Sequence, residues 1–134
     1  MISTNVQLRW SDMDMYGHMY NGHYQQIYDL GKSDYFSNVL ALAFDRSDDV
    51  SVIMASIHID FLEPVLLDEQ IHVTTQIGHI GTKSFSVSQQ IISTQSGAIK
   101  SKSETTIVAY NRVTNHSVEI PTAWREKMKK DSSY

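Results

Sequence analysis

The chain has 134 residues, of which 41% are hydrophobic and 19% are charged, and its formal net charge is −4. This length is typical of a single domain, here residues 1–134, and the negative charge argues against nucleic acid as a partner. The absence of cysteine excludes disulfides, thiolate catalysis and cysteine-bound zinc. Because no apolar run is long enough to span a membrane and the N-terminus does not resemble a signal peptide, we expect a cytoplasmic protein without a membrane partner.

The first half of the chain contains one strand pattern and one helix pattern. Residues 4–10 alternate between apolar and polar side chains, which predicts a first β-strand. From about Gly22 the pattern changes to helical spacing, with a stripe formed by Tyr24, Ile27, Tyr28, Gly31 and Tyr35. Glycine costs a helix about 1 kcal/mol relative to alanine, so we expect Gly31 to mark a close approach to a sheet. Residues 39–44 predict a short helical extension, followed by a polar loop at 45–49.

The second half of the chain reads as strands joined by tight turns. The strand-like runs are 53–61, 71–77, 85–91 and 99–109. In the first run the odd-numbered residues from Ile53 to Phe61 share one face. The last run contains small residues, which suit a place where a helix lies close to the sheet. The opposite face carries further apolar residues, which predict contact with a partner: Val52, Met54, Leu62, Val108 and Tyr110. A short amphipathic helix is predicted at about 121–130.

Together these elements predict an α+β fold. An antiparallel sheet with one apolar face has to cover that face, and the long helix is the only sizeable segment available to do so. We therefore predict an antiparallel β-sheet wrapped around one long central α-helix.

The segment between the first strand and the helix carries the residues with the most reactive chemistry. A helix start offers free backbone N–H groups and the positive end of the helix dipole, both of which stabilise developing negative charge. A carboxylate such as Asp14, facing that helix start, could attack a carbonyl carbon or activate water to do so. The same residues also fit ordinary turn and cap positions, so their spacing alone leaves both interpretations open.

Three blocks of sequence, taken together, indicate a family. They are R-W-x-D-x-D-x-x-G-H-x-x-N-x-x-Y at 9–24, I-D-F-L-E-P-V at 59–65 and G-T-K-S-F at 81–85. In this order they resemble the hotdog-fold acyl-CoA thioesterases of the 4-hydroxybenzoyl-CoA thioesterase family, and the first block also resembles the motif of plant acyl-carrier-protein (acyl-ACP) thioesterases. The resemblance implies a hotdog fold whose subunits pair edge to edge, giving a homodimer or a homotetramer.

The resemblance also assigns catalytic roles. Asp14 matches the catalytic carboxylate, acting as nucleophile or general base, and Asn21 stands where a backbone N–H binds the thioester oxygen. Asn21 could instead simply cap the helix. His18 matches the histidine of the plant motif, where it would polarise the carbonyl or orient water. Tyr16 stands where the plant enzymes have asparagine, and a phenol cannot replace a carboxamide, so their water-activating arrangement is not expected here.

Further positions are assigned to binding or to shaping the site. The resemblance places Tyr16, Gly17 and Tyr24 at the substrate, and it places Lys83 and Ser84 in the turn that holds the nucleotide phosphates of coenzyme A. A neighbouring carboxylate, Asp12, is expected to shape the loop by binding backbone N–H groups.

No metal or cofactor is expected. His58 and Asp60 share a strand face and His72 could approach them, but nothing in the sequence supplies a third ligand. The family implied by the resemblance needs no cofactor, because coenzyme A arrives as part of the substrate.

The sequence therefore predicts hydrolysis of an acyl-CoA or acyl-ACP thioester to a free acid and a thiol. Two alternatives remain open: a non-catalytic module that binds acyl thioesters, and a hotdog hydratase or dehydratase acting on enoyl thioesters. The sequence does not specify the acyl group, the carrier, or whether the assembly is a dimer or a tetramer.

Overall fold

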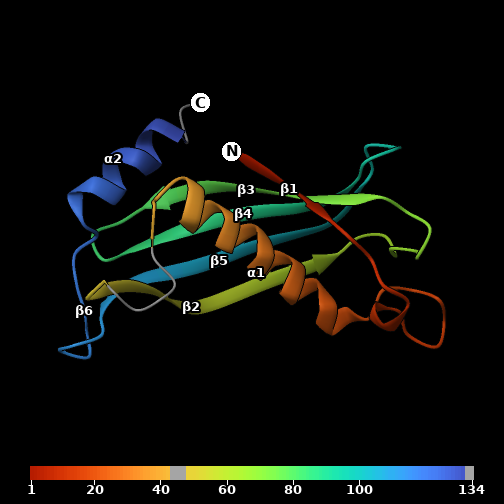
Figure 1. Ribbon diagram of the computed structural model, residues 1–134, viewed down its shortest axis with the longest axis horizontal. Coiled ribbons are helices and arrows are strands. Elements are labelled where there is room, and N and C mark those ends of the chain that lie inside the picture. The colour runs from red at the N-terminus through yellow and green to blue at the C-terminus, as the bar shows by residue number, and fades with distance from the viewer. Residues whose placement is uncertain (43–47, 132–134) are drawn as a thin grey trace.

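The structure, a computed structural model, describes residues 1–42 and 48–131. Its strands form one antiparallel sheet in the order β1-β3-β4-β5-β2, and the long helix α1 crosses one face of that sheet (Figure 1). The elements are β1 (Ile2–Val6), the 3-10 turn η1 (Trp10–Asp12), α1 (Asn21–Asn38), β2 (Val50–Phe61), β3 (Ile71–Ile80), β4 (Ser84–Ser93), β5 (Ile99–Asn111), β6 (His116–Ser117) and α2 (Thr122–Asp131). The predicted antiparallel sheet around one long helix is confirmed.

Helix α1 lies directly on the sheet at Gly31. A Cβ atom at this position would be 2.7 Å from Thr75 Oγ1 and 2.8 Å from Gln89 Nε2, so only glycine fits without a shift of its neighbours. The predicted close approach is confirmed, although the contacts come from β3 and β4 and not from the small residues of β5. Those small residues serve the preceding turn of the helix, where the Tyr28 hydroxyl donates a hydrogen bond of 2.6 Å to Ser101 Oγ.

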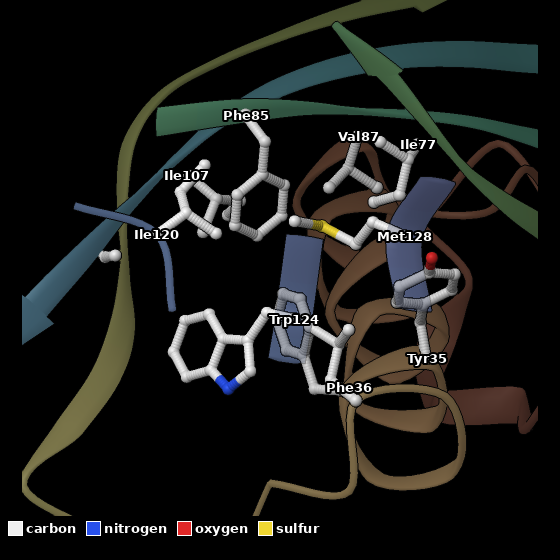
Figure 2. Close-up of a cluster of buried hydrophobic side chains, with 11 residues drawn as sticks. Tyr35, Phe36, Ile77, Phe85, Val87, Ile107, Ile120, Trp124 and Met128 are labelled. Atoms are coloured by element: carbon white, nitrogen blue, oxygen red, sulfur yellow. The ribbon is translucent and has the colours of Figure 1, made fainter. Parts of the chain in front are cut away.

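The buried apolar side chains form two clusters, one under each half of α1. The first half packs on a cluster made of Met19, Tyr24, Ile27, Tyr28, Val65, Ile71, Val73 and Ile91. The second half packs on a larger cluster that includes two residues of α2, Trp124 and Met128. Figure 2 shows these two side chains reaching from α2 toward Phe36 and Phe85, whose rings meet edge to face with centroids 6.5 Å apart. The predicted tail helix is therefore part of the core.

A β-bulge in β2 overturns part of the predicted face assignment. Met54 pairs with Ile107 and Ser56 pairs with Thr106, so Ala55 is an extra residue without a partner on β5. A single extra residue reverses the alternation of side chains beyond it. Before the bulge the even-numbered residues therefore face the helix, and after it the odd-numbered residues do. Accordingly Val52 and Met54 lie on the helix face, whereas Ile53 lies on the opposite face and is 46% exposed.

Two predicted boundaries are also wrong. The first strand is β1 at Ile2–Val6 and not 4–10, because the Asp12 carboxylate accepts the Arg9 backbone N–H and closes a 3-10 turn there. Helix α1 ends at Asn38 and does not continue through residues 39–42, where Ala41 has a φ of 56°. Residues 43–47, which include the end of the predicted extension and part of the predicted polar loop, lie outside the described residues. Within the described part of the chain, no helix is long and apolar enough to cross a membrane.

Candidate active site

The segment that precedes α1 forms a small hairpin around Asp14. The Asp14 backbone N–H donates to the His18 carbonyl at 2.7 Å, and the Gly17 N–H donates back to the Asp14 carbonyl at 3.1 Å. Gly17 has a φ of +78°, a conformation that residues with a Cβ rarely adopt, and this lets the hairpin turn tightly. The hairpin holds Asp14 and His18 beside the start of the helix.

One oxygen of the Asp14 carboxylate is used by the hairpin. Its Oδ1 atom accepts the backbone N–H of Tyr16 at 2.8 Å and that of His18 at 3.2 Å. The other oxygen, Oδ2, makes no hydrogen bond within the described residues. The carboxylate is therefore oriented by its own turn, and one oxygen remains for a substrate or a water molecule. The interpretation of Asp14 as a turn residue and its interpretation as a reactive group are compatible.

The second carboxylate of the motif, Asp12, has the predicted structural role. It is buried and accepts the Arg9 backbone N–H at 2.9 Å and the Arg9 guanidinium at 3.0 Å. Its Oδ2 atom also lies 3.2 Å from Nε2 of His23 in the first turn of α1. Burial raises the pKa of Asp12, but the hydrogen bonds from Arg9 and the charge of His23 outweigh it, so the net pKa is lowered.

A pocket of about 550 Å³ lies between the hairpin and the start of α1. Its lining residues are Asp14, His18, Met19, Tyr20, Asn21, Tyr24, Phe61, Leu62, Glu63 and Pro64. All three residues predicted as catalytic, Asp14, His18 and Asn21, therefore share one pocket. Asn21 is the first residue of α1, and its backbone N–H has no partner within the described residues. The helix cap is Tyr20, which makes no side-chain cap bond, so Asn21 is not the cap.

The predicted substrate-binding residues of the motif divide between two sites. Tyr24 is buried in the main pocket, and its ring meets Phe61 edge to face with centroids 4.8 Å apart. Burial raises the pKa of its hydroxyl. Gly17 lines a second pocket of about 470 Å³ that also includes Asp14, together with Trp10, Met13, Met15 and Leu67. Tyr16 is 77% exposed and does not line either pocket.

The predicted phosphate-binding residues lie far from Asp14 within this chain. Lys83 belongs to the link between β3 and β4, and Ser84 is the first residue of β4. Figure 1 shows this link at one end of the sheet and the hairpin that carries Asp14 at the other end. Lys83 is exposed, and its carbonyl accepts the Ala109 N–H at 2.9 Å. Within one subunit these residues do not line the pocket of Asp14.

Six residues of the pocket lining were not predicted as site residues, and neither was Lys100 behind it; the six are Met19, Tyr20, Phe61, Leu62, Glu63 and Pro64. Phe61 and Glu63 line the pocket from the end of β2, and Lys100 forms ion pairs with Glu63 at 3.4 Å and with Glu69 at 3.0 Å. Burial lowers the pKa of Lys100, but Glu69 and Glu63 outweigh it and the net pKa is raised. Phe61, Glu63 and the neighbouring Pro64 belong to the sequence block at 59–65 that indicated the family. Their place in the pocket could not be predicted from that block, because it depends on how the end of β2 packs against the hairpin.

The described residues contain no group of three side chains placed to hold a metal ion. The His58 ring lies 2.9 Å from the Asp60 carboxylate on the face of the sheet opposite α1, as their shared strand face predicted. His72 does not approach them as predicted, because β4 and β5 lie between its strand β3 and β2; its Nδ1 atom is 2.9 Å from the Thr94 hydroxyl.

Comparisons with known proteins agree over nearly the whole chain. A model of the thioesterase-like superfamily matches residues 8–128. Long-chain acyl-CoA thioesterase FadM of Escherichia coli is 21% identical over 127 residues, which cover 95% of this chain and 96% of that protein. A Thermus thermophilus thioesterase complexed with coenzyme A and Zn has a TM-score of 0.84 at 20% identity, covering 97% of this chain and 92% of that one. A 1,4-dihydroxy-2-naphthoyl-CoA thioesterase from Synechocystis has a TM-score of 0.83 at 17% identity, covering 94% and 93%.

Proposed function

The chain belongs to the thioesterase-like superfamily, has the hotdog fold and is a thioester hydrolase, and we propose that its reaction takes place between Asp14 and the start of α1. One observation supports this proposal most directly: the same pocket is lined by a carboxylate with one unengaged oxygen and by a helix N-terminus whose first N–H has no partner within the described residues. The carboxylate supplies the attack on the carbonyl carbon, and the helix start stabilises the negative charge that then forms on the oxygen.

Asp14 Oδ2 can take part in the hydrolysis by two routes. As a nucleophile it adds to the thioester carbonyl and the C–S bond breaks, which leaves an acyl-aspartyl anhydride and a thiolate. Water then hydrolyses the anhydride, regenerates the Asp14 carboxylate and supplies the proton that the thiolate takes up. As a general base it takes a proton from water while the hydroxide adds to the carbonyl, and the proton passes to the departing thiolate. In both routes the products are a carboxylic acid and a thiol, and the Asn21 N–H binds the oxyanion.

His18 and Tyr24 have supporting roles in this proposal. The His18 ring is exposed and has no hydrogen bond within the described residues, so it is available to polarise the carbonyl or to orient the water. Tyr24 and Phe61 form the apolar floor against which the acyl group packs. Tyr16 is assigned to the rim of the entrance, and Gly17 to the turn that aims the carboxylate.

Assembly explains how Lys83 and Ser84 contribute. Strand β2 is an edge strand of 12 residues, and it pairs only with β5 among the described strands. Antiparallel pairing of two β2 strands about a two-fold axis reverses the sheet, so it brings the 81–84 link of one subunit to the hairpin end of the other. The proposed site therefore lies between subunits of a homodimer, either alone or within a homotetramer, and the Lys83 ammonium meets the nucleotide phosphates.

The remaining parts of the proposal follow from the substrate. Coenzyme A is the carrier that we favour, because a solved relative is complexed with it; the acyl carrier protein is the alternative. No cofactor is needed beyond the carrier itself, and a cytoplasmic location fits a pool of acyl-CoA.

A panel of acyl-CoA thioesters, assayed by detection of released thiol, tests the proposal. It should include a long saturated acyl chain and a bicyclic aromatic acyl group, since relatives are named for both. Release of free thiol together with the free acid supports hydrolysis. Hydration of an enoyl thioester without thiol release would replace it with the hydratase alternative, and tight binding without turnover would replace it with the binding module.

A further inference from the structure

Lys100 is a nearly buried lysine beside the candidate active site. Its side chain is 11% exposed, and its ammonium is 3.0 Å from Glu69 Oε2, 3.4 Å from Glu63 Oε2 and 3.3 Å from the Pro64 carbonyl oxygen. The second Glu69 oxygen, Oε1, lies 3.3 Å away, so oxygens of three residues surround the ammonium, which is held in a fixed place and holds these residues in return. Two of these contacts, Glu63 and Pro64, belong to the pocket lining.

The backbone of Lys100 holds the same segment. Its carbonyl oxygen accepts the N–H groups of Leu62 at 3.0 Å and of Glu63 at 3.1 Å. We call residues 62–66 the pocket wall. The wall is therefore attached to the start of β5 through both the backbone and the side chain of one residue. Its far end is fixed by Glu69, whose carboxylate accepts the Leu66 N–H at 3.1 Å while also binding Lys100.

The pocket wall in turn supports the catalytic hairpin. The Met19 N–H donates to the Val65 carbonyl at 2.8 Å, and His18 forms an isolated β-bridge with Leu66. Met19 and Leu66 thus place the strand of the hairpin that follows Asp14. A displacement of the wall moves His18 and the carboxylate turn relative to the start of α1, which is fixed separately by Asp12 and His23.

We infer that Lys100 is a positioning residue for the reaction, which sets the distance between Asp14 and the helix start by holding the pocket wall. The inference rests on the proposed function. Lys100 does not touch the reacting atoms. Its effect is on geometry, and a misplacement of about 1 Å at a reacting group costs up to about 100-fold in rate.

The test compares Lys100→Met with Lys100→Arg and Glu69→Gln. Lys100→Met keeps the aliphatic stem but removes the ammonium. Lys100→Arg restores a cation, and Glu69→Gln weakens the far anchor while leaving Lys100 in place. Lys102→Met is the matched control, because it removes the same charge two residues along β5 from an exposed position outside the pocket. Each variant is assayed at a temperature at which circular dichroism shows it to be folded.

We expect Lys100→Met to lower kcat for an acyl-CoA at least about 10-fold with KM changed less than about 3-fold, because the loss is in alignment and not in ground-state binding. Lys100→Arg should recover most of kcat, Glu69→Gln should lower it in part, and Lys102→Met should leave it unchanged. If Lys100→Met does not fold, the Glu69→Gln result decides.

A kcat within 2-fold of the parent value in folded Lys100→Met, or in Glu69→Gln where the former does not fold, would overturn the inference and leave Lys100 a stabilising residue only. Failure of the proposed function is a different result, since the parent protein would then release no thiol from any thioester.

Discussion

The Asp12 carboxylate lies 3.2 Å from the His23 ring, so the segment before the hairpin of Asp14 is tied to the first turn of α1. Asp12 is also two residues from Asp14 in sequence, although its surroundings are opposite in kind. Asp12 is buried and fully engaged, whereas Asp14 is partly exposed and has one unengaged oxygen. From this contrast we expect a structural role for Asp12 and a chemical role for Asp14.

Replacement of the inner carboxylate should mainly affect stability. Asp12→Asn should lower the free energy of unfolding by about 1–3 kcal/mol at neutral pH, because it leaves buried partners without their anion. The pKa of Asp12 is lowered in the folded protein, so its contribution is present above the unfolded pKa and is lost as pH falls through the folded one. Thermal unfolding of parent and variant from pH 7 down to pH 3 should therefore show a difference that shrinks in acid. A constant difference would contradict the ionic origin.

Replacement of the outer carboxylate should mainly affect turnover. Asp14→Asn retains the size of the side chain and an oxygen that can accept the Tyr16 N–H, but it removes the anion. We expect kcat to fall at least about 100-fold while acyl-CoA binding and the unfolding temperature change little. Asp12→Asn is the matched control for charge and should lose much less activity. If Asp12→Asn abolishes turnover while Asp14→Asn retains it, the assignment of the motif is wrong.

The charge at the 81–84 link should act on binding. Lys83→Glu should raise KM for an acyl-CoA much more than it lowers kcat, because the nucleotide phosphates are remote from the reacting bond. A truncated thioester of the same acyl group without the nucleotide should be unaffected. Lys102→Glu, the same reversal at an exposed position of β5, is the control. An unchanged KM for the CoA substrate would place the phosphates elsewhere.

Assembly can be measured directly. Because the proposed site needs the Lys83 link of a second subunit, the protein should be at least dimeric at micromolar concentration. Sedimentation velocity should show a species of at least twice 15.3 kDa. A profile with only the 15.3 kDa species would exclude a site between subunits. A kinetic assay gives a second measurement. The rate should be proportional to enzyme concentration above the range in which the dimer dissociates, and below that range it should fall more steeply than the enzyme concentration.

The sequence predicted the elements and the pocket residues that depend on local pattern. The helix stripe through Gly31 and the spacing from Asp14 to Asn21 describe short stretches, so a repeat or a motif is enough to find them. The C-terminal helix was predicted for the same reason. These parts of the molecule are specified by residues close together in the chain.

The errors have a common physical origin in contacts between distant residues. The bulge at Ala55 adds one residue without disturbing the apolar alternation, so the reversal of faces in β2 is visible only in its pairing with β5. Lys100 binds residues that lie 31 to 37 positions earlier, and no local pattern marks that contact. The sequence offered one indication of this contact. It has a lysine within a strand-like run, and acidic residues near the proline that ends another strand.

The two buried clusters under α1 support different parts of the molecule. The cluster with Tyr24 and Val65 supports the hairpin and the pocket, whereas the cluster with Trp124 and Met128 fastens the C-terminal helix at the other end. The second cluster also lies beside the 81–84 link, where the Ile120 N–H donates to the Thr82 carbonyl at 2.9 Å. Changes there should therefore affect stability and nucleotide binding more than they affect the bond-breaking step. Such a layout allows preference for the acyl group to evolve at one end of a small protein while preference for the carrier evolves at the other.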